Sequence, residues 1–372
     1  MIGLEDTPKR IFDRSSVYLT NNSPTLKYRA GSQGPNAHWG QLKLMMTELL
    51  FLSDNYNTSK HTKPVVVYAG AAHGDHIPIL SKMFPKIRWI LYDPSKFNIT
   101  SDDKITIVNE FYTNDVSEQI KERADEEGWD IFFISDIRLA PEDGDNPDDV
   151  SYEKESQIEE DMKMQEGWHN ILKPVASLLK FRIPYTITEV NGEFKYLPGE
   201  LMIQPFPPRF SGESRLVVKE NNVQVNFGTR WYEEVMFYHN IVTRPHYEYE
   251  PLTKSEKGSY FPSLRRDYDS MWVTYASMRY TEWVKSNMGK DLNVKEETEV
   301  VSKYIVDSLT EEVSKRGENY PIIPFKRALS ISTMISKLIA INNNDMNQFS
   351  LPRDLIRRMT GSRKERPSLK FR

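Results

Sequence analysis

The chain has 372 residues, a formal net charge of -4 and no cysteine. These values exclude disulfides, thiolate metal sites and cysteine nucleophiles, and they exclude a polycation that coats nucleic acid without specificity. Any RNA contact must therefore be a local patch. No run of about 18 apolar residues occurs, and the first residues lack the apolar core of a signal peptide, so we expect a cytoplasmic protein with no membrane partner.

The first expected element is a helix from Gly40 to Leu52, where Lys43 falls away from the centre of the apolar face, a position at which lysine is usually solvated. From Pro64 the chain alternates between apolar runs and helical patterns, which predicts a parallel sheet covered by helices. The expected strands are 64–70, 87–93, 104–110 and 129–136, with helices at 76–83 and from about 114. Continuous apolar runs such as Val65–Tyr68 are typical of strands buried on both faces.

The second half of the chain predicts further strands and a helical end. An acidic loop at 141–149 leads to a long helix from about Asp149 to Leu172, and strands are expected at 176–182, 201–206 and 214–219. The fold is therefore α/β, with about seven strands. We predict one large domain over 1–320 and a helical extension over 321–372. The extension ends in a basic tail that is expected to be mobile, as a solubilising end or as an RNA-binding arm.

A turn rich in small residues, from Gly70 to His76, follows the first strand of the alternating region. Glycines there allow close approach of a ligand, and the second strand ends in Asp93, where an acid can accept both hydroxyls of an adenosine ribose. Turn and acid together indicate a nucleoside-containing cofactor. The turn departs from GxGxxG, so pyrophosphate binding is less favoured, but pattern alone leaves a nicotinamide cofactor open. His73 and His76 are expected to be structural, because a tetrahedral metal site needs more ligands; we expect no metal.

Two charged residues stand at the ends of later strands. Asp136 ends the fourth strand, where it could cap the next turn or face the ligand cleft, with equal weight on position alone. Lys180 lies in an apolar run and needs a partner, because burying an unpaired ammonium is costly. If Lys43 and Glu213 join these two residues, the charges could leave Lys180 able to take a proton as a general base.

Six blocks carry a resemblance that extends from about Tyr28 to about Gly317. They are, in order, GQLKLMMTELLFL, VVVYAGAAHGDHI, LYDPSKF, FFISDIR, KPVASLLKFRIPY and QPFPPRFSGESRLV. Together they resemble the poxvirus-type cap-specific mRNA 2'-O-methyltransferases, a family that also serves as the small subunit of the viral poly(A) polymerase. The resemblance implies a Rossmann-like class I methyltransferase fold, S-adenosylmethionine as methyl donor and capped mRNA as substrate.

The same resemblance implies roles for individual residues. A Lys-Asp-Lys-Glu tetrad falls on Lys43, Asp136, Lys180 and Glu213, with Lys180 as the base and the other three residues tuning it and orienting the ribose. The implied contacts of S-adenosylmethionine are Gln41, Tyr68, Gly70, Ala72, Gly74, His76, Asp93, Phe111 and Asp136. This chain has Ala71 and His73 where the family has Ser and Pro, so the contacts of the methionine part are expected to differ.

The resemblance also implies a site for the methylated guanine of the cap. Tyr185 and Tyr28 would supply the two stacking rings, since a cationic base stacks well on electron-rich faces, and Glu233 would accept from the guanine N–H edge. The alternative is that both tyrosines are ordinary surface aromatics. The family's second acid is absent, because Thr186 and Ile187 follow Tyr185. Cap affinity or cap selectivity is therefore expected to differ.

Three functions remain in competition at this point. The first is 2'-O-methylation of the first transcribed nucleotide of capped mRNA, which the intact tetrad favours. The second is a processivity subunit that forms a heterodimer with a poly(A) polymerase catalytic subunit and grips RNA through a basic surface. The third is methylation of another RNA. The expected location is the host cytoplasm or a viral factory, with the virion as an alternative.

Overall fold

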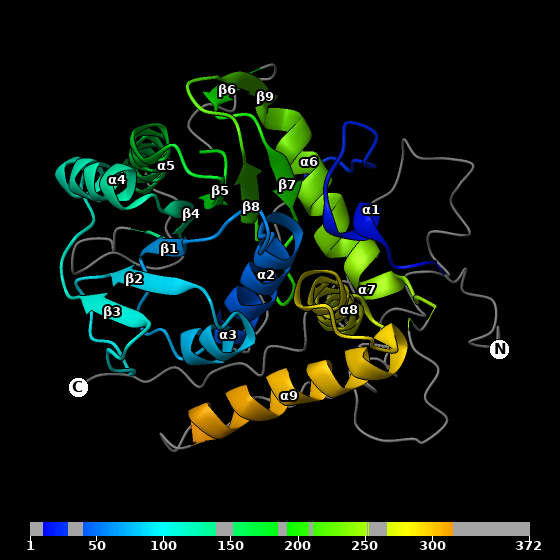
Figure 1. Cartoon of the computed structure of the whole chain (residues 1–372). Helices are drawn as coiled ribbons and strands as arrows, with labels where there is room; N and C mark the ends of the chain where they lie inside the picture. Colours follow the sequence, from blue (N-terminus) through cyan, green and yellow to red (C-terminus); the bar gives the residue numbers. More distant parts are fainter. Residues whose placement is uncertain are drawn as a thin grey trace, which may run out of the picture.

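The computed structural model describes residues 10–28, 40–138, 152–184, 192–207, 211–250, 252 and 266–314. Within these ranges a seven-stranded sheet has the order β3-β2-β1-β4-β5-β8-β7 (Figure 1). Its strands are β1 (Pro64–Ala69), β2 (Arg88–Tyr92), β3 (Ile105–Val108), β4 (Asp130–Ser135), β5 (Ala176–Phe181), β7 (Glu200–Met202) and β8 (Ser214–Val218). Strands β1 to β5 pair in parallel, whereas β8 is antiparallel to both of its neighbours. This arrangement confirms the prediction of an α/β, Rossmann-like fold with a seven-stranded, mainly parallel sheet.

The strand order reverses between β1 and β4. The chain moves from β1 to β2 and β3 on one side, and it returns to β4 and β5 on the other side of β1. In open α/β sheets, ligands bind outside the carboxyl ends of the strands at such a switch point. The ends of β1 and β4 therefore mark where a ligand site is expected.

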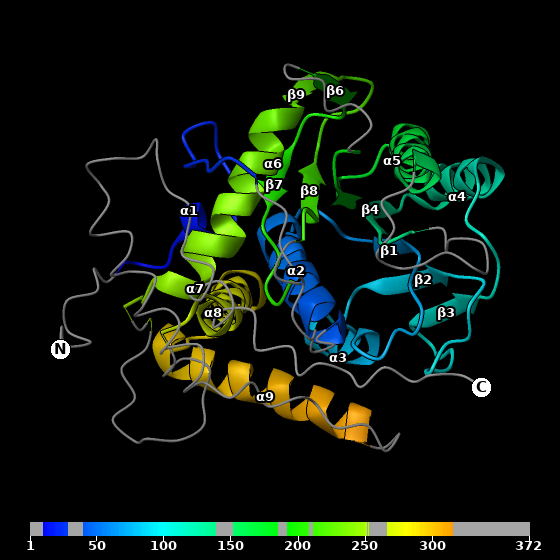
Figure 2. The same ribbon diagram turned by 180° about the vertical axis from the view of Figure 1, so that it is seen from behind.

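Helices cover both faces of the sheet, as Figures 1 and 2 show from opposite sides. One core contains residues of α2 (Gly40–Asn55), α3 (Ile77–Met83) and α8 (Tyr268–Met288), with α9 (Val294–Ser314) packed against α8. The core on the other face contains residues of α4 (Asn114–Glu127) and α5 (Tyr152–Leu172). Both faces of the central strands are thus removed from water, which explains the continuous apolar runs of β1 and β4.

Local sequence signals define the helix ends. Thr113 caps α4, because its hydroxyl accepts from the backbone N–H of Val116, and Gly128 ends the helix at a φ of 70°. The left-handed backbone conformation is disfavoured for any residue with a Cβ, so glycine ends this helix with little strain. Asp267 caps α8 in the same way as Thr113, by accepting from the N–H of Ser270.

Several elements were not predicted from the sequence. Strands β6 (Glu193–Tyr196) and β9 (Val225–Gly228) form a separate antiparallel pair. After β9 come α6 (Thr229–Tyr238), a π-helical turn (His239–Thr243) and α7 (Arg244–His246), and near the start lies α1 (Arg14–Val17). The sequence did not predict the β6–β9 pair, because β7 and β8 of the main sheet lie between these two strands in the chain.

Three sequence predictions fall outside the described residues: the acidic loop at 141–149, the extension over 321–372 and the cap residue Tyr185. Within the described ranges, no helix is both long enough and apolar enough to cross a membrane.

Candidate active site

The turn after β1 packs against the end of β4. Gly70 has a φ of 80°, and a Cβ on it would lie 2.9 Å from the carbonyl carbon of Asp136 and 2.9 Å from the nitrogen of Ile137. The N–H groups of Gly70 and Ala71 both donate to the carbonyl of Tyr92, at 2.9 and 3.2 Å. Only glycine allows this close approach, so the turn is held between the ends of β2 and β4 and its open side faces the switch point.

Asp93, just after β2, fixes the far side of the same turn. Its carboxylate accepts from the N–H of Ala72 at 3.1 Å and from the N–H of Ser95 at 2.8 Å. An ionised carboxylate has about four acceptor positions, so it keeps capacity for ribose hydroxyls. The backbone N–H of Asp93 donates to the carbonyl of Val108 at the end of β3. Three residues further on, the ring of Phe111 is 62% exposed. A carboxylate with remaining acceptor capacity after β2 and an exposed ring after β3 fit an adenosine-containing cofactor.

Gln41, at the start of α2, is held by a buried network. His76 Nδ1 lies 2.8 Å from Gln41 Oε1, and His76 Nε2 lies 3.0 Å from Glu48 Oε2. The hydroxyl of Tyr68 donates to the other oxygen of Glu48 at 2.8 Å. Tyr68 and His76 have no exposed surface. Their buried side chains support Gln41, and their contact with a cofactor stays a prediction.

Two further residues of the turn, Ala72 and Gly74, were expected to contact the cofactor. Gly74 has a φ of 77°. His73 points elsewhere, because its Nδ1 lies 3.0 Å from the carbonyl of Lys96. No group of three or more metal-ligating side chains was found among the residues that the structure describes.

The four residues of the expected tetrad come together at the end of β5. Lys180 Nζ lies 3.1 Å from Asp136 Oδ1 and 3.6 Å from Glu213 Oε2, and Lys43 Nζ lies 3.1 Å from Glu213 Oε1. Lys43 stands at a helix position where a lysine is usually solvated, but its side chain is only 19% exposed and is paired, as membership of the tetrad requires. The partner that Lys180 was expected to need is Asp136, which faces this cluster rather than only capping a turn.

Two further cations, Arg138 and Arg215, reach the cluster and were not predicted. Arg138 lies 4.0 Å from Glu213 Oε2 and 3.3 Å from Asp161 Oδ2. The guanidinium of Arg215 lies 2.7 Å from Asp136 Oδ1, and its side chain is 2% exposed. Arg215 is directly opposite Lys180 in the antiparallel β5–β8 register, so the two side chains share one face of the sheet. Gln204 bridges the cluster by accepting from Arg215 at 3.1 Å and donating to Glu213 at 3.0 Å.

The cations of this cluster keep its carboxylates ionised. Burial raises the pKa of Asp136, but the positive charges of Arg215, Lys180 and Lys43 outweigh burial and lower that pKa to about 2. The pKa of Glu213 is likewise held well below its usual value, because Lys180, Lys43 and Arg215 overcome the effect of burial. Both carboxylates are therefore negative at neutral pH.

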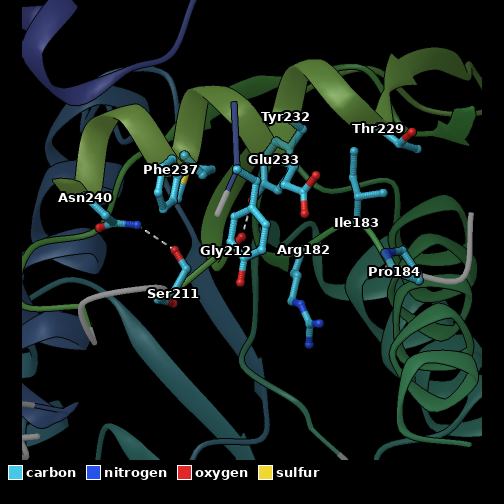
Figure 3. Close-up of a pocket in the computed structure, with 12 residues that line it drawn as sticks. Arg182, Ile183, Pro184, Ser211, Gly212, Thr229, Tyr232, Glu233, Phe237 and Asn240 are labelled. Carbon is cyan, nitrogen blue, oxygen red and sulfur yellow. Dashed lines mark hydrogen bonds between the residues drawn. The ribbon is translucent and has the colours of Figure 1, made fainter. Parts of the chain in front are cut away.

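A pocket opens beside this cluster, between α6 and the end of β5. It is lined by Tyr28, Arg182, Ile183, Pro184, Ser211, Gly212, Thr229, Tyr232, Glu233, Met236, Phe237 and Asn240. Figure 3 shows Glu233 and Phe237 on one helix, with Arg182, Ile183 and Pro184 entering from the end of β5. Burial and the neighbouring Glu234 raise the pKa of Glu233.

Two of the three expected cap residues line this pocket. Tyr28 packs edge-on against Phe237 with ring centroids 5.2 Å apart, and it remains 37% exposed. The backbone N–H of Leu26 donates to the carbonyl of Glu234 at 3.1 Å, which ties the N-terminal segment to α6. Tyr28 and Glu233 thus share one pocket, whereas Tyr185 lies outside the described residues.

Comparison with known proteins gives consistent matches. The chain matches the family described as poly A polymerase regulatory subunit over residues 12–308. It is 30% identical over 237 residues to the cap-specific mRNA (nucleoside-2'-O-)-methyltransferase of Fowlpox virus (strain NVSL), covering 60% of this chain and 73% of that protein. It is 27% identical over 255 residues to the protein of that name from Myxoma virus (strain Lausanne), covering 62% and 70%.

Among solved structures, human methyltransferase-like protein 13 in complex with SAH superposes with a TM-score of 0.27 at 10% identity, covering 58% of this chain and 96% of that chain. This overlap is too slight to bear on fold or function.

Proposed function

The chain belongs to the poly A polymerase regulatory subunit family, and we propose that it is a cap-specific mRNA 2'-O-methyltransferase. The proposed reaction transfers a methyl group from S-adenosylmethionine to the 2'-hydroxyl of the first transcribed nucleotide. The observation that supports it most directly is the position of Lys180, which lies 3.1 Å from Asp136 and two residues from Arg182 of the open pocket. A base, a cofactor surface and a ligand pocket thus meet at one edge of the sheet.

The residues of the cofactor surface would hold S-adenosylmethionine, which supplies an electrophilic methyl group on a sulfonium. Asp93 would accept from the ribose hydroxyls, Phe111 would offer its exposed ring to the adenine, and the turn at Gly70 would let the backbone approach closely. Gln41, anchored by His76, closes the side nearest α2.

Lys180 acts as the general base in this proposal. Its neutral amine takes the proton of the 2'-hydroxyl while the oxygen attacks the methyl carbon and the carbon–sulfur bond breaks. Asp136 also contacts Arg215 and Glu213 also contacts Lys43, so each buried carboxylate keeps a cation when Lys180 is neutral.

The pocket beside the cluster would hold the 7-methylguanosine of the cap. Tyr28 presents a ring to a cationic base, and Glu233 presents a carboxylate to the guanine N–H edge. Gly212 lines the pocket next to Glu213 of the cluster. A cap held there therefore leaves the first transcribed nucleotide close to Lys180.

The test is methyl transfer from labelled S-adenosylmethionine to short RNA with a 7-methylguanosine cap, an unmethylated cap or no cap. We expect cap-dependent transfer to the first nucleotide that is abolished in Lys180→Ala and retained in Lys195→Ala, an exposed lysine on β6. Methyl transfer that does not depend on the cap would support a methyltransferase that acts on another RNA. No transfer by folded, cofactor-binding protein would leave the processivity role.

The family description supports a second role, as the regulatory partner of a poly(A) polymerase catalytic subunit. Tail extension by that catalytic subunit, with and without this chain, measures the role directly. Lys180→Ala should retain the stimulation, because the two activities need different atoms. We further propose that the protein works in the host cytoplasm, which imaging of tagged protein in infected cells would test.

A further inference from the structure

The hydroxyl of Tyr232 joins two segments that carry the cluster. Tyr232 lies on α6 and is 3% exposed. Its hydroxyl donates to the carbonyl of Gly212 at 2.6 Å, lies 2.9 Å from the hydroxyl of Ser214, and is 3.4 Å from the carbonyl of Phe181. Its ring also packs edge-on against the ring of Phe181, with centroids 5.2 Å apart.

These contacts lie next to two residues of the cluster, Glu213 and Lys180. Gly212 and Ser214 are the residues on either side of Glu213, and Phe181 directly follows Lys180. The distance between Lys180 Nζ and Glu213 Oε2 is 3.6 Å, and it depends on how the Glu213 loop sits against the end of β5. One buried hydroxyl therefore fixes that loop beside the base.

A second tie from the same helical stretch holds the same loop. The amide of Asn240 donates to the carbonyl of Ser211 at 2.7 Å, and Figure 3 shows this bond at one end of the pocket. Ser211 in turn accepts from the N–H of Glu213 at 3.1 Å. Asn240 lies in the π-helical turn that follows α6, and such turns are frequent at functional sites.

The same helix presents Glu233 and Phe237 to the pocket. We propose that Tyr232 is a positioning residue that couples occupation of this pocket by a capped RNA to the placement of Glu213 beside Lys180. The proposal rests on the proposed function. A cap that engages Glu233 bears on the helix that carries the neighbouring Tyr232, and the hydroxyl of Tyr232 transmits this restraint to the Glu213 loop.

The experiment compares Tyr232→Phe with Tyr196→Phe. Both substitutions remove one buried hydroxyl from the same core cluster, but the hydroxyl of Tyr196 has no hydrogen-bond partner among the described residues. For Tyr232→Phe we expect kcat on capped RNA to fall about tenfold, with KM for RNA within about twofold of wild type, as for loss of a contact that aligns the reacting groups. Tyr196→Phe should match wild type in both constants.

A second readout does not require turnover. Hydrogen exchange at the amide of Glu213, resolved by NMR from the pocket-lining Ser211 and Gly212, should slow when a 7-methylguanosine cap dinucleotide is added to wild type, and it should not respond in Tyr232→Phe. If wild type transfers no methyl group, the proposed function is refuted. The exchange response needs no methyl transfer, so it tests the coupling separately.

Wild-type kcat in Tyr232→Phe would overturn the proposal, as would a raised KM at unchanged kcat or an exchange response that survives the substitution. If Tyr232→Phe does not fold, Asn240→Asp carries the same expectation, because a carboxylate cannot donate to the carbonyl of Ser211.

Discussion

Replacement of Arg215 by glutamine tests whether this buried cation keeps Asp136 ionised beside Lys180. Against the effect of burial, Arg215 is the strongest of the positive charges that hold the pKa of Asp136 at about 2, so Arg215→Gln raises that pKa. Once Asp136 takes a proton, it no longer pairs as an anion with Lys180, and the rate of methyl transfer falls. Glutamine retains an amide that can donate to Asp136.

The size of the effect follows from the geometry. The guanidinium of Arg215 lies 2.7 Å from Asp136 Oδ1. For charge centres about 4 Å apart at an effective dielectric constant of about 20, their attraction is about 4 kcal/mol. Since about 1.4 kcal/mol corresponds to one pH unit, the variant should lose activity relative to wild type below a pH that lies about 3 units above the pKa of Asp136 in wild type.

The assay is the initial rate of methyl transfer to capped RNA between pH 4 and pH 9. The expected result is a ratio of variant to wild-type rate that falls about tenfold per pH unit below about pH 5 and is constant at higher pH. Breaking a buried ion pair costs about 3 kcal/mol, so rates are measured well below the melting temperature of the variant. Arg279→Gln, which removes a distant ion pair with Asp54, is the control. A parallel drop at every pH would refute the reasoning.

Three further predictions concern other parts of the molecule. Phe111→Ala should weaken binding of S-adenosylhomocysteine about fivefold by calorimetry with little change in melting temperature, because the ring is exposed; an unchanged Kd would remove Phe111 from the cofactor surface. Glu233→Gln should weaken binding of a capped dinucleotide about tenfold in a fluorescence titration, with cofactor binding as the control; equal affinity would contradict the cap assignment. Burial, and then Arg244, lower the pKa of His239 from 6.5 to about 3, so the unfolded state alone binds a proton between these values and stability falls as the pH falls through them. Denaturation at pH 6.5 and 5.5 should show a loss of about 1 kcal/mol that is absent in His239→Phe, and identical losses in both proteins would exclude His239 as the cause.

The sequence predicted the central strands and one essential pairing. Val65–Tyr68 and Ile131–Ile134 are apolar on both faces, and they became β1 and β4. A lysine inside the apolar run of β5 required a partner, and Asp136 was the available acid at a neighbouring strand end. These predictions succeeded because they depend on local composition and on the cost of burying a charge.

Arg215 carried the same signal as Lys180 and was still missed. It is a charged residue in the buried run of β8, but no local feature of the sequence indicates that β8 pairs with β5 in antiparallel register. That register alone places Arg215 opposite Lys180. A charged residue in a buried strand predicts a partner, whereas the identity of the partner depends on topology.

Helical position alone did not indicate that Lys43 reaches the cluster. Helical periodicity correctly placed it off the apolar face of α2, and such a position usually faces water. The beginning of α2 instead faces Glu213, which is 170 residues away in the sequence. Periodicity cannot tell a solvent-facing position from one that faces a polar cleft.

The charged groups of the site form a chain in which the signs alternate: Arg215, Asp136, Lys180, Glu213 and Lys43. Both carboxylates contact Lys180, and each also contacts a second cation, so a neutral Lys180 would leave neither of them without a positive partner. The ion pairs alone do not choose between the two lysines as the proposed base. Position favours Lys180, because it lies one residue before the end of β5, which leads into the proposed cap pocket, whereas Lys43 lies on α2 near Gln41 of the proposed cofactor surface. The proposed base thus depends on where the substrate would be held as well as on charge.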